Sequence, residues 1–332
     1  MILRSRGNAR PLPARDQLTI CFAHVAYRLG ERFALRNAGL DWFEVRSADE
    51  LQARIAEADV LLCSGLWRND LIARAPRLCF IQSISAGTDQ YSREALGGAG
   101  IRVASAQGAN ERAVAEHALA LILALARKLP EARDNQFAKK WRGMIGEIAR
   151  REDELGGKTL LIVGLGRIGS RLARLARAFD MKIVGIRRDV SRGAGAADRV
   201  VGEEGLLAVL GEADFVALTC PLTPATENLI DARAFAAMKP SAYLVNVARG
   251  RVVNEPALVA ALGRGGIAGA ALDCVWQEPL PADSKLWSLP NVLITPHTAG
   301  ETRRYEDNVI DLLLENLARL WRGEEELKNQ FV

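Results

Sequence analysis

Three side chains with acid–base or anion-binding chemistry, Arg249, Glu278 and His297, each follow an apolar run that predicts a β-strand. Parallel strands end at one edge of a sheet, where ligands bind in open α/β folds, so we expect these side chains to meet. Arginine binds carboxylates through its planar fork, histidine exchanges protons near neutral pH, and a nearby glutamate favours the imidazolium. The set suits reduction of a 2-oxo acid, which needs a cation for the carboxylate and an acid for the carbonyl oxygen.

Each of these residues alone has an ordinary structural explanation. His297 could be a hydrogen-bonded loop histidine, Arg249 could close a surface ion pair, and Glu278 could be a solvated acid before a proline. Their joint placement after three strands, behind a nucleotide-binding motif, favours the catalytic interpretation.

That motif is a glycine loop, GLGRIG, which fits the dinucleotide-binding pattern G-x-G-x-x-G. It follows the expected strand Thr159–Val163 and precedes a helix expected over Ser170–Phe179, the context that the motif requires. The glycines permit a tight turn, close approach of a pyrophosphate and close packing of helix on strand. The predicted cofactor-binding residues of this loop are Gly164, Gly166, Arg167, Ile168 and Gly169.

Two arginines stand where the ribose of the cofactor is usually read. The next expected strand, Lys182–Ile186, is followed by Arg187 and Arg188, where an NAD site usually has an acid. Arginine attracts a 2′-phosphate, so the pattern favours NADP. In the alternative interpretation both arginines are solvated and Asp189 serves NAD.

Two series of short apolar runs, separated by helical stretches such as Ala48–Ala58, must position these residues. The first series is Leu18–Phe22, Val60–Cys63, Leu78–Ser83 and Ile101–Ala104. The second is Thr159–Val163, Lys182–Ile186, Phe215–Thr219, Tyr243–Val247, Ile267–Leu272 and Val292–Thr295. This alternation predicts an α/β chain with doubly wound parallel sheets.

Two long helices accompany the series. Asn110 is a fair N-cap for a helix over Glu111–Lys128 that Pro130 ends. Apart from Glu116 and His117 its middle is apolar on every side, so we expect it to be buried all round, partly by a partner subunit. A second helix is expected over Thr302–Arg322, closed by Gly323.

Composition narrows the class of protein. A length of 332 residues favours two domains. The 44 basic and 40 acidic residues nearly balance, which argues against a nucleic-acid-binding protein with a strongly basic surface. The longest apolar run, Ala118–Ala126, is too short for a membrane span of about 20 residues, and no signal peptide is visible. Five scattered cysteines and three histidines predict reduced thiols in the cytoplasm and no metal site. Residues 1–16 are expected to form an extended leader.

The segments GLGRIG, CPLTPAT, NVARG, LDCVWQEPLP and TPHTAG, in this order, strongly resemble the D-isomer-specific 2-hydroxyacid dehydrogenase family. The segments SISAGTDQ and AVAEHAL extend the match over nearly the whole chain. The resemblance implies two Rossmann-like domains. A discontinuous substrate domain would cover residues 1–105 and 298–332, and a dinucleotide-binding domain residues 106–297.

The resemblance also implies roles for single residues. Arg249 would bind and polarise the oxo acid, His297 would be the general acid/base, and Glu278 would be its partner. The implied contacts to cofactor are Cys220, Pro221, Thr226, Val247, Ala248 and Asp273, and those to the substrate carboxylate are Ser85, Ala86 and Gly87. Trp276 departs from the usual family residue, which would reshape the mouth of the pocket.

The function expected from these observations is NADP(H)-preferring reduction of glyoxylate, hydroxypyruvate or a related 2-oxo acid, with NAD(H) as the other cofactor. The competing class is a nucleotide-sensing corepressor on the same fold. We expect a homodimer, because the stretch Glu111–Pro130 and the following arm through Phe137 and Trp141 carry more apolar surface than one subunit readily covers. The resemblance implies the same, since members of this family form two-fold dimers through the cofactor domain.

Overall fold

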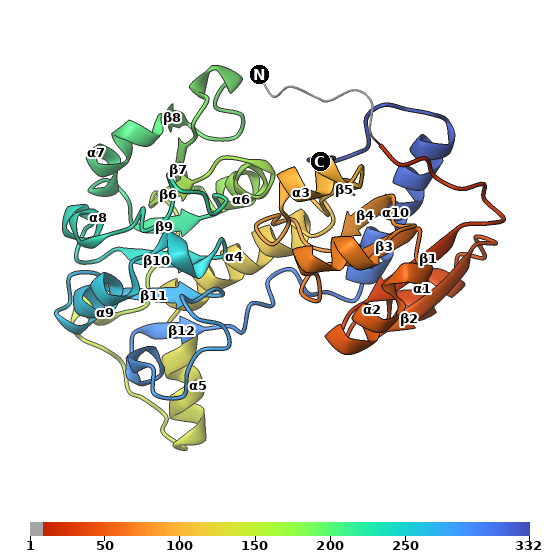
Figure 1. Cartoon of the computed structure of the whole chain (residues 1–332). Coiled ribbons are helices and arrows are strands. Elements are labelled where there is room, and N and C mark those ends of the chain that lie inside the picture. Colours follow the sequence, from red (N-terminus) through yellow and green to blue (C-terminus); the bar gives the residue numbers. More distant parts are fainter. Residues whose placement is uncertain (1–8) are drawn as a thin grey trace. The chain divides into compact units, whose positions relative to one another are not determined.

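The apolar runs form two parallel β-sheets, each in its own compact unit of the chain (Figure 1). The structure, a computed structural model, describes residues 9–332. One unit runs up to Asn110 and resumes over Glu301–Val332, and the other is Glu111–Gly300. The sequence had placed these exchanges at residues 105/106 and 297/298. Part of the leader expected over residues 1–16 lies outside the described residues.

The first unit holds, within the described residues, five parallel strands in the order β2-β1-β3-β4-β5. The strands are β1 (Thr19–Ala23), β2 (Asp41–Val45), β3 (Val60–Cys63), β4 (Phe80–Ser83) and β5 (Arg102–Ala104). The helices are α1 (Leu29–Ala34), α2 (Ala48–Arg54), α3 (Arg93–Gly98) and α10 (Tyr305–Trp321), with short 3₁₀ turns at Ile55–Glu57 and Asn69–Arg74. One face of the sheet packs under α1 and α10 and the other under α2 and α3, so α10 completes a core begun by the first hundred residues.

The second unit holds, over the same described range, seven parallel strands in the order β12-β11-β10-β9-β6-β7-β8. The strands are β6 (Thr159–Val163), β7 (Lys182–Ile186), β8 (Arg199–Val201), β9 (Phe215–Leu218), β10 (Tyr243–Asn246), β11 (Gly269–Leu272) and β12 (Val292–Ile294). The helices are α4 (Glu111–Ala126), α5 (Leu129–Phe137), α6 (Arg167–Arg177), α7 (Leu206–Leu210), α8 (Ala232–Ala237) and α9 (Glu255–Gly263). The 3₁₀ turns are Ile148–Arg150, Val190–Arg192, Glu203–Gly205, Gly250–Val252 and Lys285–Ser288. Strand β6 lies between β7 and β9, which makes the β6–β9 boundary the switch point of a doubly wound sheet.

The predicted fold class, two parallel α/β domains of Rossmann type, is confirmed, but several elements differ from expectation. Strands β2 and β8 were missed, because Asp41–Val45 has exposed residues at its start and Arg199–Val201 is only three residues long at a sheet edge. Helix α6 begins at Arg167 rather than Ser170, so the glycine loop runs directly into its first turn.

The helix expected over Glu111–Lys128 was wrong at its end. Helix α4 stops at Ala126, Lys128 adopts a left-handed conformation with φ of 49°, and a new helix starts at Leu129. Pro130 lies in the first turn of α5, where its missing N–H costs nothing. Within the single chain Ala120 of α4 is exposed, so burial of α4 on every side stays a prediction that involves a partner subunit.

Among residues 9–332, no helix combines the length and the apolar character needed to cross a bilayer.

Candidate active site

Strands β10, β11 and β12 are neighbours in the second sheet, so the loops that follow them lie side by side (Figure 1). Arg249 lies in the loop after β10, Glu278 in the loop after β11, and His297 directly after β12. The topology therefore brings the three predicted catalytic residues to one sheet edge, as their spacing indicated.

His297 and Glu278 form a hydrogen-bonded ion pair, with His297 Nδ1 2.6 Å from Glu278 Oε2. The contacts of His297 with the Cys274 thiol and then with the Glu278 carboxylate raise its pKa to about 10, although burial works in the opposite direction. Burial raises the pKa of Glu278, but the hydrogen bond to His297 outweighs it and leaves that pKa below its ordinary value. The pair is therefore charged near neutral pH, with an imidazolium ready to donate.

Cys274 stands beside this pair and is almost fully buried. Burial raises the pKa of its thiol, so near neutral pH Cys274 is uncharged and Glu278 supplies the negative charge that His297 needs. The three donor atoms lie within 4.8 Å of one another, and such donors can bind zinc. However, two ligands of one tetrahedral zinc stand roughly 3.4 Å apart, whereas His297 Nδ1 and Glu278 Oε2 are 2.6 Å apart. The spacing is that of a pair sharing a proton.

The loop that carries Arg249 is shaped by Asn246, a residue that the sequence analysis did not single out. The Asn246 side chain accepts the Ala248 N–H at 3.0 Å and donates to the Arg249 carbonyl at 3.0 Å. Arg249 itself is half-buried, and its guanidinium donates to the Ala248 carbonyl at 2.8 Å. The signal that the sequence offered for Asn246 was a polar amide near the end of the apolar run Tyr243–Val247.

Gly250 is required for close packing of the two loops. A Cβ at Gly250 would lie 1.8 Å from the Val275 carbonyl oxygen, which is backbone and cannot rotate away. The Val275 N–H in turn donates to Glu278 Oε1 at 3.1 Å. The glycine therefore lets the loop after β10 lie against the loop that holds Glu278.

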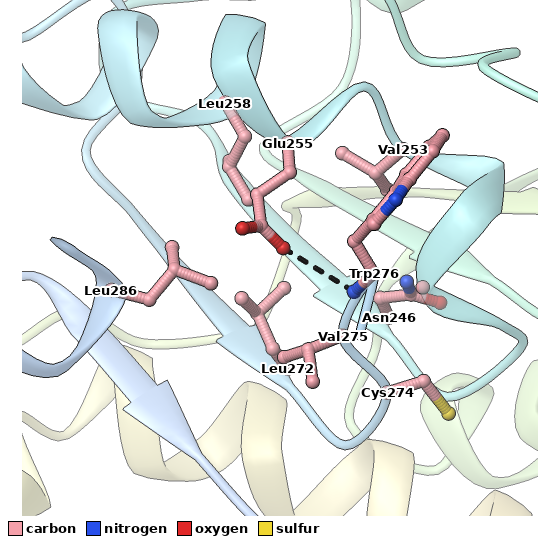
Figure 2. Close-up of a pocket in the computed structure, with 10 residues that line it drawn as sticks. Asn246, Val253, Glu255, Leu258, Leu272, Cys274, Val275, Trp276 and Leu286 are labelled. Atoms are coloured by element: carbon pink, nitrogen blue, oxygen red, sulfur yellow. Dashed lines mark hydrogen bonds between the residues drawn. The ribbon is translucent and has the colours of Figure 1, made fainter. Parts of the chain in front are cut away.

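A second contact fixes the same loop from the other side, at a small, mostly apolar pocket (Figure 2). Glu255, at the start of α9, accepts the Trp276 N–H at 3.3 Å. Trp276 remains 42% exposed, and the Arg251 guanidinium lies over its ring at 5.6 Å. The Glu255 carboxylate thus holds the loop that precedes Glu278, and Leu258, Leu272 and Leu286 are among the residues that line the pocket.

The glycine loop has the geometry of a pyrophosphate cradle. Gly164 has φ of +102°, and a Cβ there would meet the Cys220 backbone at 2.5 Å. A Cβ at Gly169 would meet the Gly164 carbonyl at 2.4 Å, whereas at Gly166 it would meet no described atom within 4 Å. The open position precedes the first turn of α6, whose backbone N–H groups attract phosphate. The loop also lies at the β6–β9 switch point, so its residues fit a dinucleotide.

The other predicted cofactor contacts lie around the same crevice or directly after β10 and β11. Cys220 follows β9, and burial raises the pKa of its thiol to about 11, so it packs as a small neutral group. Thr226 donates to the Pro221 carbonyl at 2.7 Å and holds the following loop together. Val247 and Ala248 are nearly buried after β10. Asp273 is 2% exposed, and its carboxylate accepts hydrogen bonds from its own unit.

The loop after β7 contains the residues expected to read the ribose. The Arg187 guanidinium donates to the Gly193 carbonyl at 2.8 Å, and Asp189 accepts the Ser191 hydroxyl at 2.6 Å. Arg188 is exposed and has no hydrogen-bond partner among the described residues. One oxygen of Asp189 is thus already occupied, whereas Arg188 is available to an anion.

In the first unit, Ser85, Ala86 and Gly87 form the loop after β4. The Ser85 N–H donates to Ser83 Oγ at 3.1 Å, and the Ser85 hydroxyl lies 2.6 Å from Ser64 Oγ. Within residues 9–332, no hydrogen bond engages the N–H groups of Ala86 and Gly87. These two groups, rather than that of Ser85, are available for a substrate carboxylate.

Comparison with known proteins places this geometry in a family. Residues 119–299 match the D-isomer specific 2-hydroxyacid dehydrogenase, NAD binding domain. The chain is 36% identical over 293 residues to glyoxylate reductase from Aeropyrum pernix, covering 85% of this chain and 86% of the relative. The chain belongs to this family. The chain is also 35% identical to D-3-phosphoglycerate dehydrogenase from Methanocaldococcus jannaschii, over 83% of this chain. This match spans only about half, 52%, of the length of that relative.

Solved structures agree with the assignment. One of them is an NADPH-dependent glyoxylate/hydroxypyruvate reductase from Sinorhizobium meliloti in complex with NADP and malonate. The chain superposes on it with a TM-score of 0.80 at 26% sequence identity, and the match covers 95% of this chain and 97% of the other. A dehydrogenase of this family is an NAD(P)-dependent oxidoreductase, so the corepressor alternative is not favoured.

Proposed function

We propose that this dehydrogenase reduces glyoxylate, hydroxypyruvate or a related small 2-oxo acid to the D-2-hydroxy acid. The observation that supports the proposal is the 2.6 Å contact between His297 Nδ1 and Glu278 Oε2, next to the arginine loop. Relatives named glyoxylate reductase favour this substrate class.

Each residue then has one task. The Arg249 guanidinium binds the substrate carboxylate and draws electron density from the carbonyl oxygen. His297 has Nδ1 engaged with Glu278, so Nε2 donates its proton to that oxygen as negative charge develops. Glu278 stabilises the imidazolium before the transfer. When bound, a reduced nicotinamide supplies the hydride that the carbonyl carbon accepts.

NADPH is the proposed preferred cofactor. The exposed Arg188 and the neighbouring Arg187 are cations at the strand end where the ribose is read, and the Asp189 carboxylate is partly occupied by Ser191. Charge-assisted hydrogen bonds to a 2′-phosphate would outweigh the single remaining acceptor of Asp189.

The experiment that tests this function is a panel of 2-oxo acids with NADH and NADPH, following the absorbance of the reduced cofactor. Glyoxylate and hydroxypyruvate should give the highest kcat/KM, and the His297→Ala variant should be the matched inactive control. Absence of turnover with every 2-oxo acid, in protein that binds NADPH, would contradict the proposal.

We also propose a homodimer in the cytoplasm. Helix α5 and the arm that follows it carry large exposed apolar side chains, with Trp141 99% exposed. These side chains are Leu129, Phe137, Trp141, Met144 and Ile148. Such a patch is typical of an interface between subunits. All five cysteines are free thiols, as in a reducing compartment.

Light scattering should return twice the chain mass of 36.1 kDa. A Trp141→Ser, Met144→Ser double variant should shift the population toward monomer, whereas the mass of a His24→Gln control should not change. A wild-type monomer at micromolar concentration would contradict the dimer.

A further inference from the structure

The chain enters the second unit after Asn110 and leaves it after Gly300, and one hydrogen-bond network joins the segments just inside these two points. Helix α4 starts directly after the first exchange at Asn110/Glu111 and carries His117. The segment Thr295–Gly300 precedes the second exchange and carries His297. Both segments meet Asp273 at the end of β11.

The Asp273 carboxylate accepts several hydrogen bonds from the segment around His297. Its Oδ1 accepts the Thr295 hydroxyl at 2.6 Å and the Thr298 N–H at 3.0 Å, and its Oδ2 accepts the Ala299 N–H at 3.1 Å. Asp273 is 2% exposed, so each of these bonds is shielded from water. The carboxylate thus forms hydrogen bonds with the chain both before His297, at Thr295, and after it, at Thr298 and Ala299.

His117 completes the network from α4. Its Nε2 lies 3.0 Å from Thr295 Oγ1 and 3.5 Å from Asp273 Oδ1. The Thr295 hydroxyl has one proton, which it donates to Asp273, so it must accept from His117. This fixes the proton of a neutral His117 on Nε2 and makes His117 a donor that orients Thr295.

His297 has an unusual backbone that needs such support. Its φ is +55°, in the left-handed region that a residue with a Cβ rarely adopts because the Cβ crowds the backbone there. The anchored residues Thr295 and Thr298 stand two before and one after it. Release of either anchor would let this turn relax and carry the imidazole away from Glu278.

We infer that His117, acting through Thr295 and Asp273, is a positioning residue for proton transfer that holds His297 in its turn without touching substrate. The inference rests on the proposed function for its kinetic consequence, but the network itself concerns only residues of the second unit. It also gives Asp273 a task in shaping the active-site loop in addition to the cofactor contact expected for it.

The test compares His117→Leu, which removes the donor, with His117→Gln, whose amide N–H can replace Nε2–H. Glu116→Gln is the matched control, because Glu116 is an exposed neighbour on the same helix. With three histidines in the chain, NMR of the full-length protein can follow the His297 imidazole through a pH titration. Steady-state kcat and KM for the 2-oxo acid form the second measurement.

In His117→Leu the His297 titration should move toward the ordinary histidine value, and kcat should fall about tenfold, since small misplacement of a reacting group is costly. KM for the oxo acid should stay within about twofold, because Arg249 is untouched. His117→Gln should recover most of kcat, and Glu116→Gln should behave as wild type.

An unchanged His297 titration in His117→Leu would overturn the inference, as would a His117→Gln variant as impaired as His117→Leu. Should His117→Leu fail to fold, Thr295→Val, which keeps the shape and removes the hydroxyl, must show the same titration shift. If no 2-oxo acid is turned over at all, the proposed function fails while the titration still decides this inference.

Discussion

The two ends of the second sheet differ in how far the chain itself fixes their functional side chains. At the loops after β10, β11 and β12, Glu278 and Asp273 have described partners at hydrogen-bond distance. At the loop after β7, Arg187 and Asp189 also have partners, but Arg188 is exposed and has no hydrogen-bond partner among residues 9–332. Proton transfer demands groups held in place before substrate arrives, whereas recognition of a phosphate can form its bonds with the ligand itself.

The two ends are also far apart. Five strand spacings separate β12 from β7 in the sheet order, or about 24 Å at roughly 4.8 Å each. Effects of substitutions at the two ends should therefore add. The following predictions test that separation, beginning with the largest effect.

His297→Ala should lower kcat by about 10²–10⁴-fold, because the proposed general acid is lost. The Kd for NADPH, measured by fluorescence titration, should remain within about twofold, since the glycine loop is distant. Equal turnover by the variant would remove His297 from the mechanism, and loss of cofactor binding would show that the two ends are not independent.

Arg249→Lys should lower kcat/KM by about 10²-fold, with a rise in the oxo-acid KM as well as a fall in kcat, because a point charge cannot replace the planar fork. Arg251→Lys is the matched control: it lies two residues on and pairs with Glu227 at the surface. Near-normal constants for Arg249→Lys would mean that another cation holds the carboxylate.

Cofactor preference should be a smaller effect, about 10–100-fold in kcat/KM for NADPH over NADH, from charge-assisted bonds of roughly 1.5–3 kcal/mol. Arg188→Ala should remove most of this preference, and Arg187→Asp should reverse it. Steady-state rates with both cofactors measure it, with Arg192→Ala as the control. A wild-type enzyme that prefers NADH would mean that Asp189 or the backbone reads the ribose.

Glu278→Gln should change the pH dependence of reduction. In the proposed mechanism reduction needs protonated His297, whose pKa is raised to about 10, so kcat/KM should fall only at strongly alkaline pH. Without the carboxylate the alkaline limb should move down by about 1–3 pH units. The pH profile of kcat/KM for both proteins checks this. If the alkaline limb of the Glu278→Gln profile does not move, the contact with Cys274 alone raises the pKa of His297.

The same pair should contribute modestly to stability over a defined pH window. The raised pKa of His297 means that its contribution is fully present below about pH 6.5 and is lost as pH rises through about 10. The pKa of Glu278 is lowered in the folded protein, so the contribution of Glu278 to stability is lost as pH falls through this lowered pKa. The Tm difference between wild type and Glu278→Gln should therefore be largest near neutral pH and vanish above about pH 10. A constant difference would indicate a pH-independent packing effect.

The sequence predicted much of this architecture because buried parallel strands form continuous apolar runs. Lys182–Ile186 and Thr159–Val163 appear in the structure with the predicted bounds. Strand β2 was missed because its first two residues, Asp41 and Trp42, are exposed and the acidic Asp41 and Glu44 interrupt its apolar pattern. Whether Pro130 ends one helix or begins the next depends on whether the chain can turn at Lys128. Tertiary contacts decide this, and the local sequence pattern does not.

For the site, the spacing of Arg249, Glu278 and His297 predicted which strands they follow. It could not reveal His117 as a partner of Thr295, because 178 residues separate them and only packing of α4 brings them together. Nor could it show that the Ser85 N–H is occupied, since that depends on the rotamer of Ser83.

The discontinuity of the first unit has a consequence for the order in which the chain folds during synthesis. Phe22 and Phe80 of its sheet are covered by α10, whose Val309 and Leu313 are fully buried in the same core. At 5–20 residues per second, the roughly 200 residues between β5 and α10 take about 10–40 s to translate. During that interval only α1 covers this face of the five-stranded sheet, and the intervening unit gains its last strand, β12, shortly before α10 is made. The nascent first unit is therefore the part of this enzyme that a chaperone must shield.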